Sequence, residues 1–100
     1  MVKHIILWQL DDSKSAEEKE QIKKAMKVQL EGLVGKVPGL VSLQVNINPL
    51  PSSNADVMLD STLESEEALK GYAVHKDHVA VADTYVRPYT VSRVCMDYEI

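Results

Sequence analysis

The segment SAEEKEQIKKAMKVQLEGLVG, residues 15–35, carries the clearest secondary-structure signal in the chain. Ser15 followed three residues later by Glu18 is a capping box, in which each side chain accepts a hydrogen bond from a backbone amide of the first turn. The apolar residues recur at three- and four-residue spacing, with lysines and glutamates between them: Ile22, Met26, Leu30, Leu33 and, beyond the segment, Val37. This spacing, ended by Gly35 and Pro38-Gly39, predicts an amphipathic helix.

The residues before this helix, Val2–Leu10, predict a strand that is buried on both faces. The run is almost entirely apolar and stops at Asp11-Asp12-Ser13. Side chains alternate between the two faces of a strand, and here they divide into His4, Ile6, Trp8 and Leu10 against Ile5, Leu7 and Gln9. Because both sets are mostly apolar, we expect helices on one face and a partner chain on the other.

Three segments after the helix also predict strands. Leu40–Asn48 alternates apolar with polar residues, which is typical of a half-buried strand. Its expected buried face carries Val41, Leu43, Val45 and Ile47. Asp56–Leu63 follows a loop rich in proline and serine, and Tyr89–Ile100 closes the chain.

A second helical region lies between the last two strands. Ser65 supplies a hydroxyl cap, and the acidic residues after it suit the first turn of a helix. Gly71 weakens the helix by about 1 kcal/mol relative to alanine. The helical pattern resumes over 76–86, after a kink, and ends at Arg87-Pro88.

The order of these elements, β-α-β-β-α-β, predicts a ferredoxin-like α+β sandwich with both helices on one face of an antiparallel sheet. A chain of 100 residues forms one domain, residues 1–100. The uncovered sheet face predicts a homodimer, in which two sheets enclose an α/β barrel.

Composition and charge narrow the possible partners. The net charge is −4, and the lysines of the first helix lie among glutamates, so we expect no nucleic-acid partner. The apolar N-terminal run ends at Leu10, too short for a signal peptide or a membrane span, so we expect a cytoplasmic protein without a membrane partner. The single cysteine, Cys95, lies between Val94 and Met96 and is predicted to be a small core residue.

The segment YAVHKDH, residues 72–78, concentrates the groups that could carry chemistry. His75 and His78 could hold an ion from one helix, but zinc needs a third protein ligand and no further Cys/His cluster accompanies them, so we expect no metal. No glycine-rich phosphate loop is present, and we expect no cofactor. General acid/base chemistry remains, with His78 as the base, Tyr72 as its partner and His4 brought in from the first strand.

These features together resemble the Dabb family, the stress-responsive dimeric A/B barrel domains. The segments that carry the resemblance are Val2-Lys3-His4-Ile5-Ile6-Leu7, Leu63-Glu64-Ser65, Tyr72-Ala73-Val74-His75-Lys76-Asp77-His78-Val79 and Val94-Cys95-Met96-Asp97-Tyr98. The resemblance implies a homodimer and a cavity between helices and sheet. It also relates the chain to plant olivetolic acid cyclase, which closes a polyketide by aldol condensation without a cofactor. That relation implies an acid/base pair, His78 and Tyr72, and a pocket histidine, His4.

The chain also departs from the family pattern. Lys76 stands where the family usually has proline, and Met26 or Leu30 replaces an aromatic residue of the cyclase.

Three functions follow as hypotheses. The first hypothesis is a cofactor-independent cyclase or lyase acting on a polyketide-like carbonyl compound, in a pocket that is further lined by Ile6, Trp8, Leu59 and Tyr89. The second is a non-catalytic, stress-responsive ligand-binding protein. The third is a cofactor-independent monooxygenase or a haem-related activity.

Overall fold

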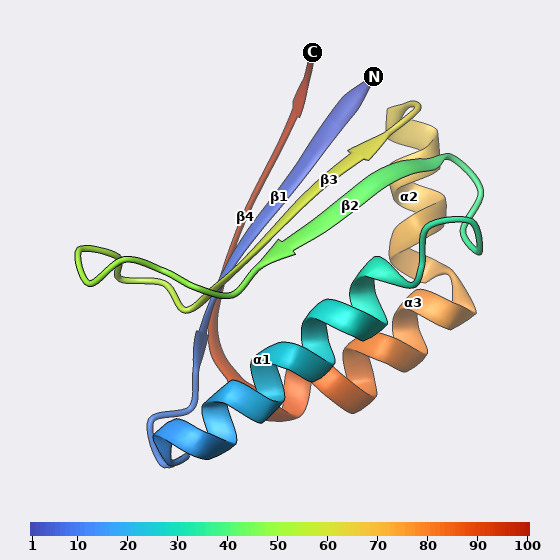
Figure 1. Cartoon of the computed structure of the whole chain (residues 1–100). Helices are drawn as coiled ribbons and strands as arrows, with labels where there is room; N and C mark the ends of the chain where they lie inside the picture. Colours follow the sequence, from blue (N-terminus) through green and yellow to red (C-terminus); the bar gives the residue numbers. More distant parts are fainter.

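The computed structural model describes all 100 residues as one antiparallel sheet with its helices on a single face (Figure 1). The strands are β1 (Val2–Leu10), β2 (Leu40–Asn46), β3 (Val57–Leu63) and β4 (Thr90–Glu99). The helices are α1 (Ala16–Glu31), α2 (Glu66–Val74) and α3 (Lys76–Val81), followed by a π-helical turn, η1 (Ala82–Val86), and a 3-10 turn, η2 (Arg87–Tyr89). The strand order β2-β3-β1-β4 confirms the predicted ferredoxin-like fold.

Helix α1 begins with the predicted capping box. The Ser15 hydroxyl accepts from the Glu18 amide, and the Glu18 carboxylate accepts from the Ser15 amide, each at 3.1 Å. The helix ends at Glu31, four residues before Gly35, and turns carry the chain to β2. Gly39 has a φ of 81°, and a Cβ there would lie 2.6 Å from the Ala68 Cβ on α2. A glycine at this position therefore allows α2 to pack closely against the start of β2.

The predicted alternation in β2 is wrong at its first position. Leu40 pairs with Leu63, but Ser42 pairs with Thr62, so Val41 is an extra residue in the ladder. This bulge buries Leu40 and leaves Val41 exposed, whereas Leu43 and Val45 are buried as expected.

The second helical region breaks at His75. The backbone of His75 is extended, with φ −63° and ψ 134°, and its Nδ1 accepts a hydrogen bond from the Asp77 amide at 3.1 Å. His75 therefore ends α2 and caps α3, which begins at Lys76 as predicted. Gly71, expected to weaken the helix, lies within α2 without interrupting it.

The two faces of the sheet differ sharply in burial. The helix-covered face contains the core, to which β1 contributes Ile6, Trp8 and Leu10 and α1 contributes Met26 and Leu30. On the opposite face β1 presents Leu7, and β4 presents Val94, Met96 and Tyr98, all exposed. Figure 1 shows that no element of the chain covers this face. Among the helices, none has the length and apolar character needed to cross a membrane.

Candidate active site between the helices and the sheet

A cavity of about 120 Å³ lies between the sheet and the second helical region. The predicted site residues that line it are His4, Ile6, Trp8, Leu59, Tyr72 and His78. Other lining residues come from every neighbouring element: Leu30, Leu69, Ala73, Ala82, Val86, Arg87, Thr90 and Arg93. The fold thus brings His4 of β1 together with Tyr72 of α2 and His78 of α3 at one mostly apolar space.

Tyr89, the remaining predicted lining residue, lies elsewhere. It borders a shallow hollow beside α1, together with Lys14, Glu18 and Tyr85. The helical path continues through the 3-10 turn Arg87–Tyr89, and β4 begins only at Thr90. Tyr89 is therefore the last residue of a helical turn rather than the first of a strand, and it does not reach the cavity.

His78 is held by the backbone of the preceding helix. Its Nδ1 lies 3.2 Å from the Ala73 carbonyl oxygen, so Nδ1 carries the proton and donates it to this bond. Burial lowers the pKa of His78 below its ordinary value of 6.5; the bond to Ala73 opposes this effect, and the charges of Arg87, His4 and Arg93 add to it. The imidazole is therefore neutral near pH 7, and its Nε2 has a lone pair that can accept a proton.

Tyr72 lies between the two histidines. Its ring centroid is 4.2 Å from that of His78, with the planes tilted by 33°, and 6.0 Å from that of His4 in an edge-on contact. The Tyr72 hydroxyl is buried and has no hydrogen-bond partner within the protein. Burial raises the pKa of this phenol well above its ordinary value of 10.0, so it remains a hydrogen-bond donor. Tyr72 thus contacts His78 through its ring, and the protein supplies no acceptor for its hydroxyl.

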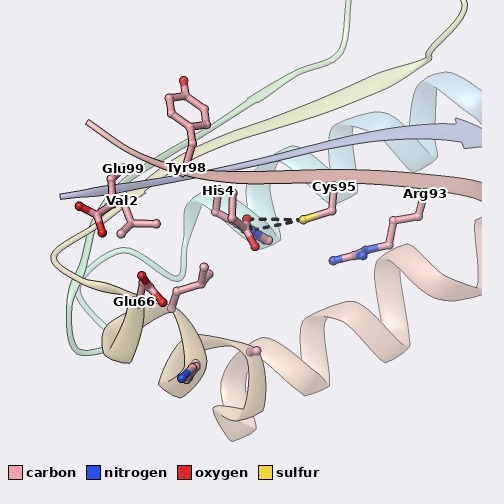
Figure 2. Close-up of a pocket in the computed structure, with 11 residues that line it drawn as sticks. Val2, His4, Glu66, Arg93, Cys95, Tyr98 and Glu99 are labelled. Atoms are coloured by element: carbon pink, nitrogen blue, oxygen red, sulfur yellow. Dashed lines mark hydrogen bonds and ion pairs between the residues drawn. The ribbon is translucent and has the colours of Figure 1, made fainter.

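His4 is part of a polar cluster that joins β1 to β4. Its Nδ1 lies 2.5 Å from the Asp97 Oδ1, and the Cys95 Sγ lies 3.7 Å from that nitrogen and 3.5 Å from that oxygen (Figure 2). The strand register explains this cluster, because His4 pairs with Asp97 and Ile6 pairs with Cys95. Cys95, predicted to be a core residue, is exposed.

The sequence reasoning missed this cluster because 93 residues separate His4 from Asp97. One signal for it was present. Arg93, Cys95 and Asp97 alternate along the last strand, and pairing with β1 puts them on the helix-covered face beside His4, Ile6 and Trp8.

A larger groove, about 630 Å³, runs between α2 and β4 next to the cavity. His4, Leu69, Ala73 and Arg93 border both spaces. Figure 2 shows the Arg93 side chain extending between β4 and the helices, whereas Tyr98 points to the opposite side of the sheet. A ligand lying in the groove could therefore reach toward Tyr72 and His78 past His4.

Comparisons with known proteins agree with this architecture. Residues 2–100 match the family model described as the Stress responsive A/B Barrel Domain, Dabb. A dimeric protein of unknown function and ferredoxin-like fold from Bacteroides fragilis is 32% identical, with a TM-score of 0.92 over 99% of this chain and 95% of that one. A dimeric ferredoxin-like protein from Thermobifida fusca is 24% identical, with a TM-score of 0.78 over 99% of this chain and 90% of that one.

A more distant structure shares the fold alone. Hydroxynitrile lyase from Passiflora edulis is 16% identical, with a TM-score of 0.76 over 99% of this chain and 92% of that one. No curated protein sequence matches the chain.

Proposed function

Because the chain belongs to the Dabb family, we propose that it binds a small, largely apolar carbonyl compound and acts on it as a cofactor-independent cyclase or lyase. The substrate would lie in the groove with its reactive carbonyl in the cavity. His78 Nε2 would remove a proton from the carbon next to the carbonyl, and the Tyr72 hydroxyl would donate a hydrogen bond to the oxygen as it becomes an enolate. For cyclisation, the enolate carbon would then attack a second carbonyl carbon of the same substrate, forming the new carbon–carbon bond and turning that carbonyl oxygen into an alkoxide. The His78 imidazolium would give its proton to this alkoxide, which completes the aldol addition and restores the base.

The observation that carries this proposal is the buried hydroxyl of Tyr72, which has no partner and belongs to a residue that lines the same cavity as His78. Leaving a buried donor unsatisfied costs about 1–3 kcal/mol, so such groups call for an explanation. A ligand carbonyl oxygen would satisfy this donor. The apolar walls formed by Ile6, Trp8 and Leu59 would exclude water from the same place.

The functional unit in this proposal is a homodimer. The uncovered sheet face carries Leu7, Val94 and Met96 in adjacent strands, where Leu7 pairs with Val94 and Ile5 pairs with Met96. A contiguous apolar face of this kind is typical of an interaction site. Similar structures, including those from B. fragilis and T. fusca, are described as dimeric.

A second candidate function is non-catalytic binding of an apolar ligand, and the mostly apolar lining of the cavity favours it. The cavity measures about 120 Å³, less than the roughly 300–1,000 Å³ of sites that enclose a whole drug-sized molecule, so it would take only part of such a ligand. In that case His78 and Tyr72 would only orient the ligand. The monooxygenase hypothesis has a counterpart in a structure named antibiotic biosynthesis monooxygenase, which is 8% identical and shares the fold alone.

Turnover by His78→Asn separates catalysis from binding. Asparagine can still donate to the Ala73 carbonyl but lacks the second ring nitrogen that acts as the base. With a linear triketo thioester as the probe and product followed by mass spectrometry, we expect this variant to lose about 10²- to 10⁴-fold in kcat/KM.

The matched control is His75→Asn, which alters a histidine outside the cavity and keeps a residue suited to the N-cap of α3. It should turn over the probe like the unaltered chain. Equal turnover by the His78 variant would eliminate His78 as the base. If the unaltered chain binds the probe tightly but does not turn it over, the result would instead support non-catalytic ligand binding.

A further inference from the structure

We propose that His4, Cys95 and Asp97 form a zinc site where the groove meets the cavity. The three residues offer an imidazole nitrogen, a thiol sulfur and a carboxylate oxygen within 4.8 Å of one another. These are the three donor types that zinc uses in proteins. A soft sulfur beside an imidazole also disfavours magnesium and calcium, which take oxygen ligands.

The spacing of the three donor atoms is close to that of a tetrahedral zinc site. Zinc bonds of about 2.0–2.3 Å at tetrahedral angles separate neighbouring ligand atoms by about 3.3–3.6 Å. The Cys95 Sγ lies 3.5 Å from the Asp97 Oδ1 and 3.7 Å from the His4 Nδ1. Only the His4–Asp97 separation, 2.5 Å, is that of a hydrogen bond and must widen. An ion bound between these two atoms would take the place of this hydrogen bond.

The strands hold the donors in this arrangement. His4 and Asp97 are directly paired across β1 and β4, and Cys95 is two residues from Asp97 on the same face. Ligands on paired strands are positioned more precisely than ligands on loops. Zinc binds cysteine as the thiolate, so binding at this cluster would release a proton.

Three protein ligands leave a fourth position for an exogenous group, as in catalytic zinc sites. The cluster borders the 630 Å³ groove, so this position would be accessible to a small molecule. Arg93 lies on the same face of β4 and borders the same groove. Its positive charge would favour an anionic fourth ligand, such as a carboxylate or a deprotonated carbonyl compound. The acid/base proposal above does not require this ion.

The test is metal titration of the untagged full chain after chelation and dialysis. With cobalt(II) as a spectroscopic substitute, we expect one ion per chain and a thiolate-to-cobalt charge-transfer band in the near ultraviolet. Zinc should displace the cobalt and abolish the band. Cys95→Ser should lose the band, and Cys95→Ser and Asp97→Asn should each weaken zinc binding by at least about tenfold.

The control for surface histidines is again His75→Asn, which should bind zinc like the unaltered chain. Circular dichroism should confirm that all variants are folded. Absence of the charge-transfer band at saturating cobalt would overturn the proposal, as would equal zinc affinity of the Cys95 variant and the unaltered chain. Because this readout needs no organic substrate, failure here leaves the acid/base function standing, and failure of turnover leaves the zinc site standing.

Discussion

The Tyr72 hydroxyl is the group in this molecule whose position is hardest to explain by folding alone. It is buried without a partner, so deleting it removes no hydrogen bond and relieves a desolvation cost. We therefore expect Tyr72→Phe to leave the free energy of unfolding unchanged or to raise it by up to about 1–3 kcal/mol, as measured by urea denaturation. The same variant should lose about 10²- to 10³-fold in kcat with the triketo thioester, because one donor to the developing oxyanion is gone.

Tyr85→Phe is the matched control for that prediction, because Tyr85 is only half-buried and does not border the cavity. Tyr85→Phe should change neither the free energy of unfolding nor kcat. A loss of more than about 1 kcal/mol in Tyr72→Phe would show that the folded protein satisfies the hydroxyl, and the case for an open donor would fail.

His78 gives a prediction about pH whose sign follows from its burial. Its pKa in the folded chain lies below the ordinary 6.5 of an exposed histidine, so the unfolded chain binds more protons as pH falls. The contribution of neutral His78 to stability is complete above about pH 6.5 and is lost as pH falls through the lower, folded value. The groups that face the ring are Tyr72 on α2, His4 on β1, Arg87 on η2 and Arg93 on β4.

The measurement is the free energy of unfolding of the unaltered chain and of His78→Asn between about pH 5 and pH 8. The advantage of the unaltered chain should shrink steadily toward the acid end, and kcat/KM should decline over the same range. A difference that stays constant with pH, or one that grows toward acid, would show that His78 is not a buried neutral base.

The sequence predicts a residue's role best where that role depends on residues nearby in the chain. His78 and Tyr72 are six positions apart, and their residue types predict an acid/base pair. In the structure they meet across a helix break, because His75 caps α3 and redirects the chain. The two rings are thus in contact, although the geometry that joins them differs from a continuous helix.

At the level of helices and strands, patterns among nearby residues predicted where each element lies. The pairing between strands decided the features that these patterns did not predict. The capping box at Ser15 and the apolar spacing of α1 depend only on residues close together in the chain, and both predictions are confirmed. The bulge at Val41 arises because β2 must match β3 residue by residue, which no pattern inside β2 reveals. The register of β4 against β1 is equally non-local, and it alone creates the cluster of His4, Cys95 and Asp97.

The whole molecule has one sheet face that its own helices do not cover, and this feature was predicted from the two apolar faces of β1. Met96 is 65% exposed there and pairs with Ile5 of β1. A charge at this position would have to be desolvated in a dimer but would stay hydrated in a monomer. We therefore expect Met96→Glu to dissociate the homodimer without lowering the free energy of unfolding of the separate monomer.

Light scattering on size-exclusion chromatography at micromolar concentration checks this prediction. The unaltered chain should show twice the chain mass, and Met96→Glu should show the chain mass. Val28→Glu is the control, because Val28 is 68% exposed but lies on α1, on the helix side of the sheet. It should remain dimeric. A monomeric mass for the unaltered chain would refute the dimer. A dimeric mass for the Met96 variant would show that the interface lies on another face. The cavity lies on the other side of the sheet, so a monomeric variant that keeps full turnover would show that each subunit carries a complete site.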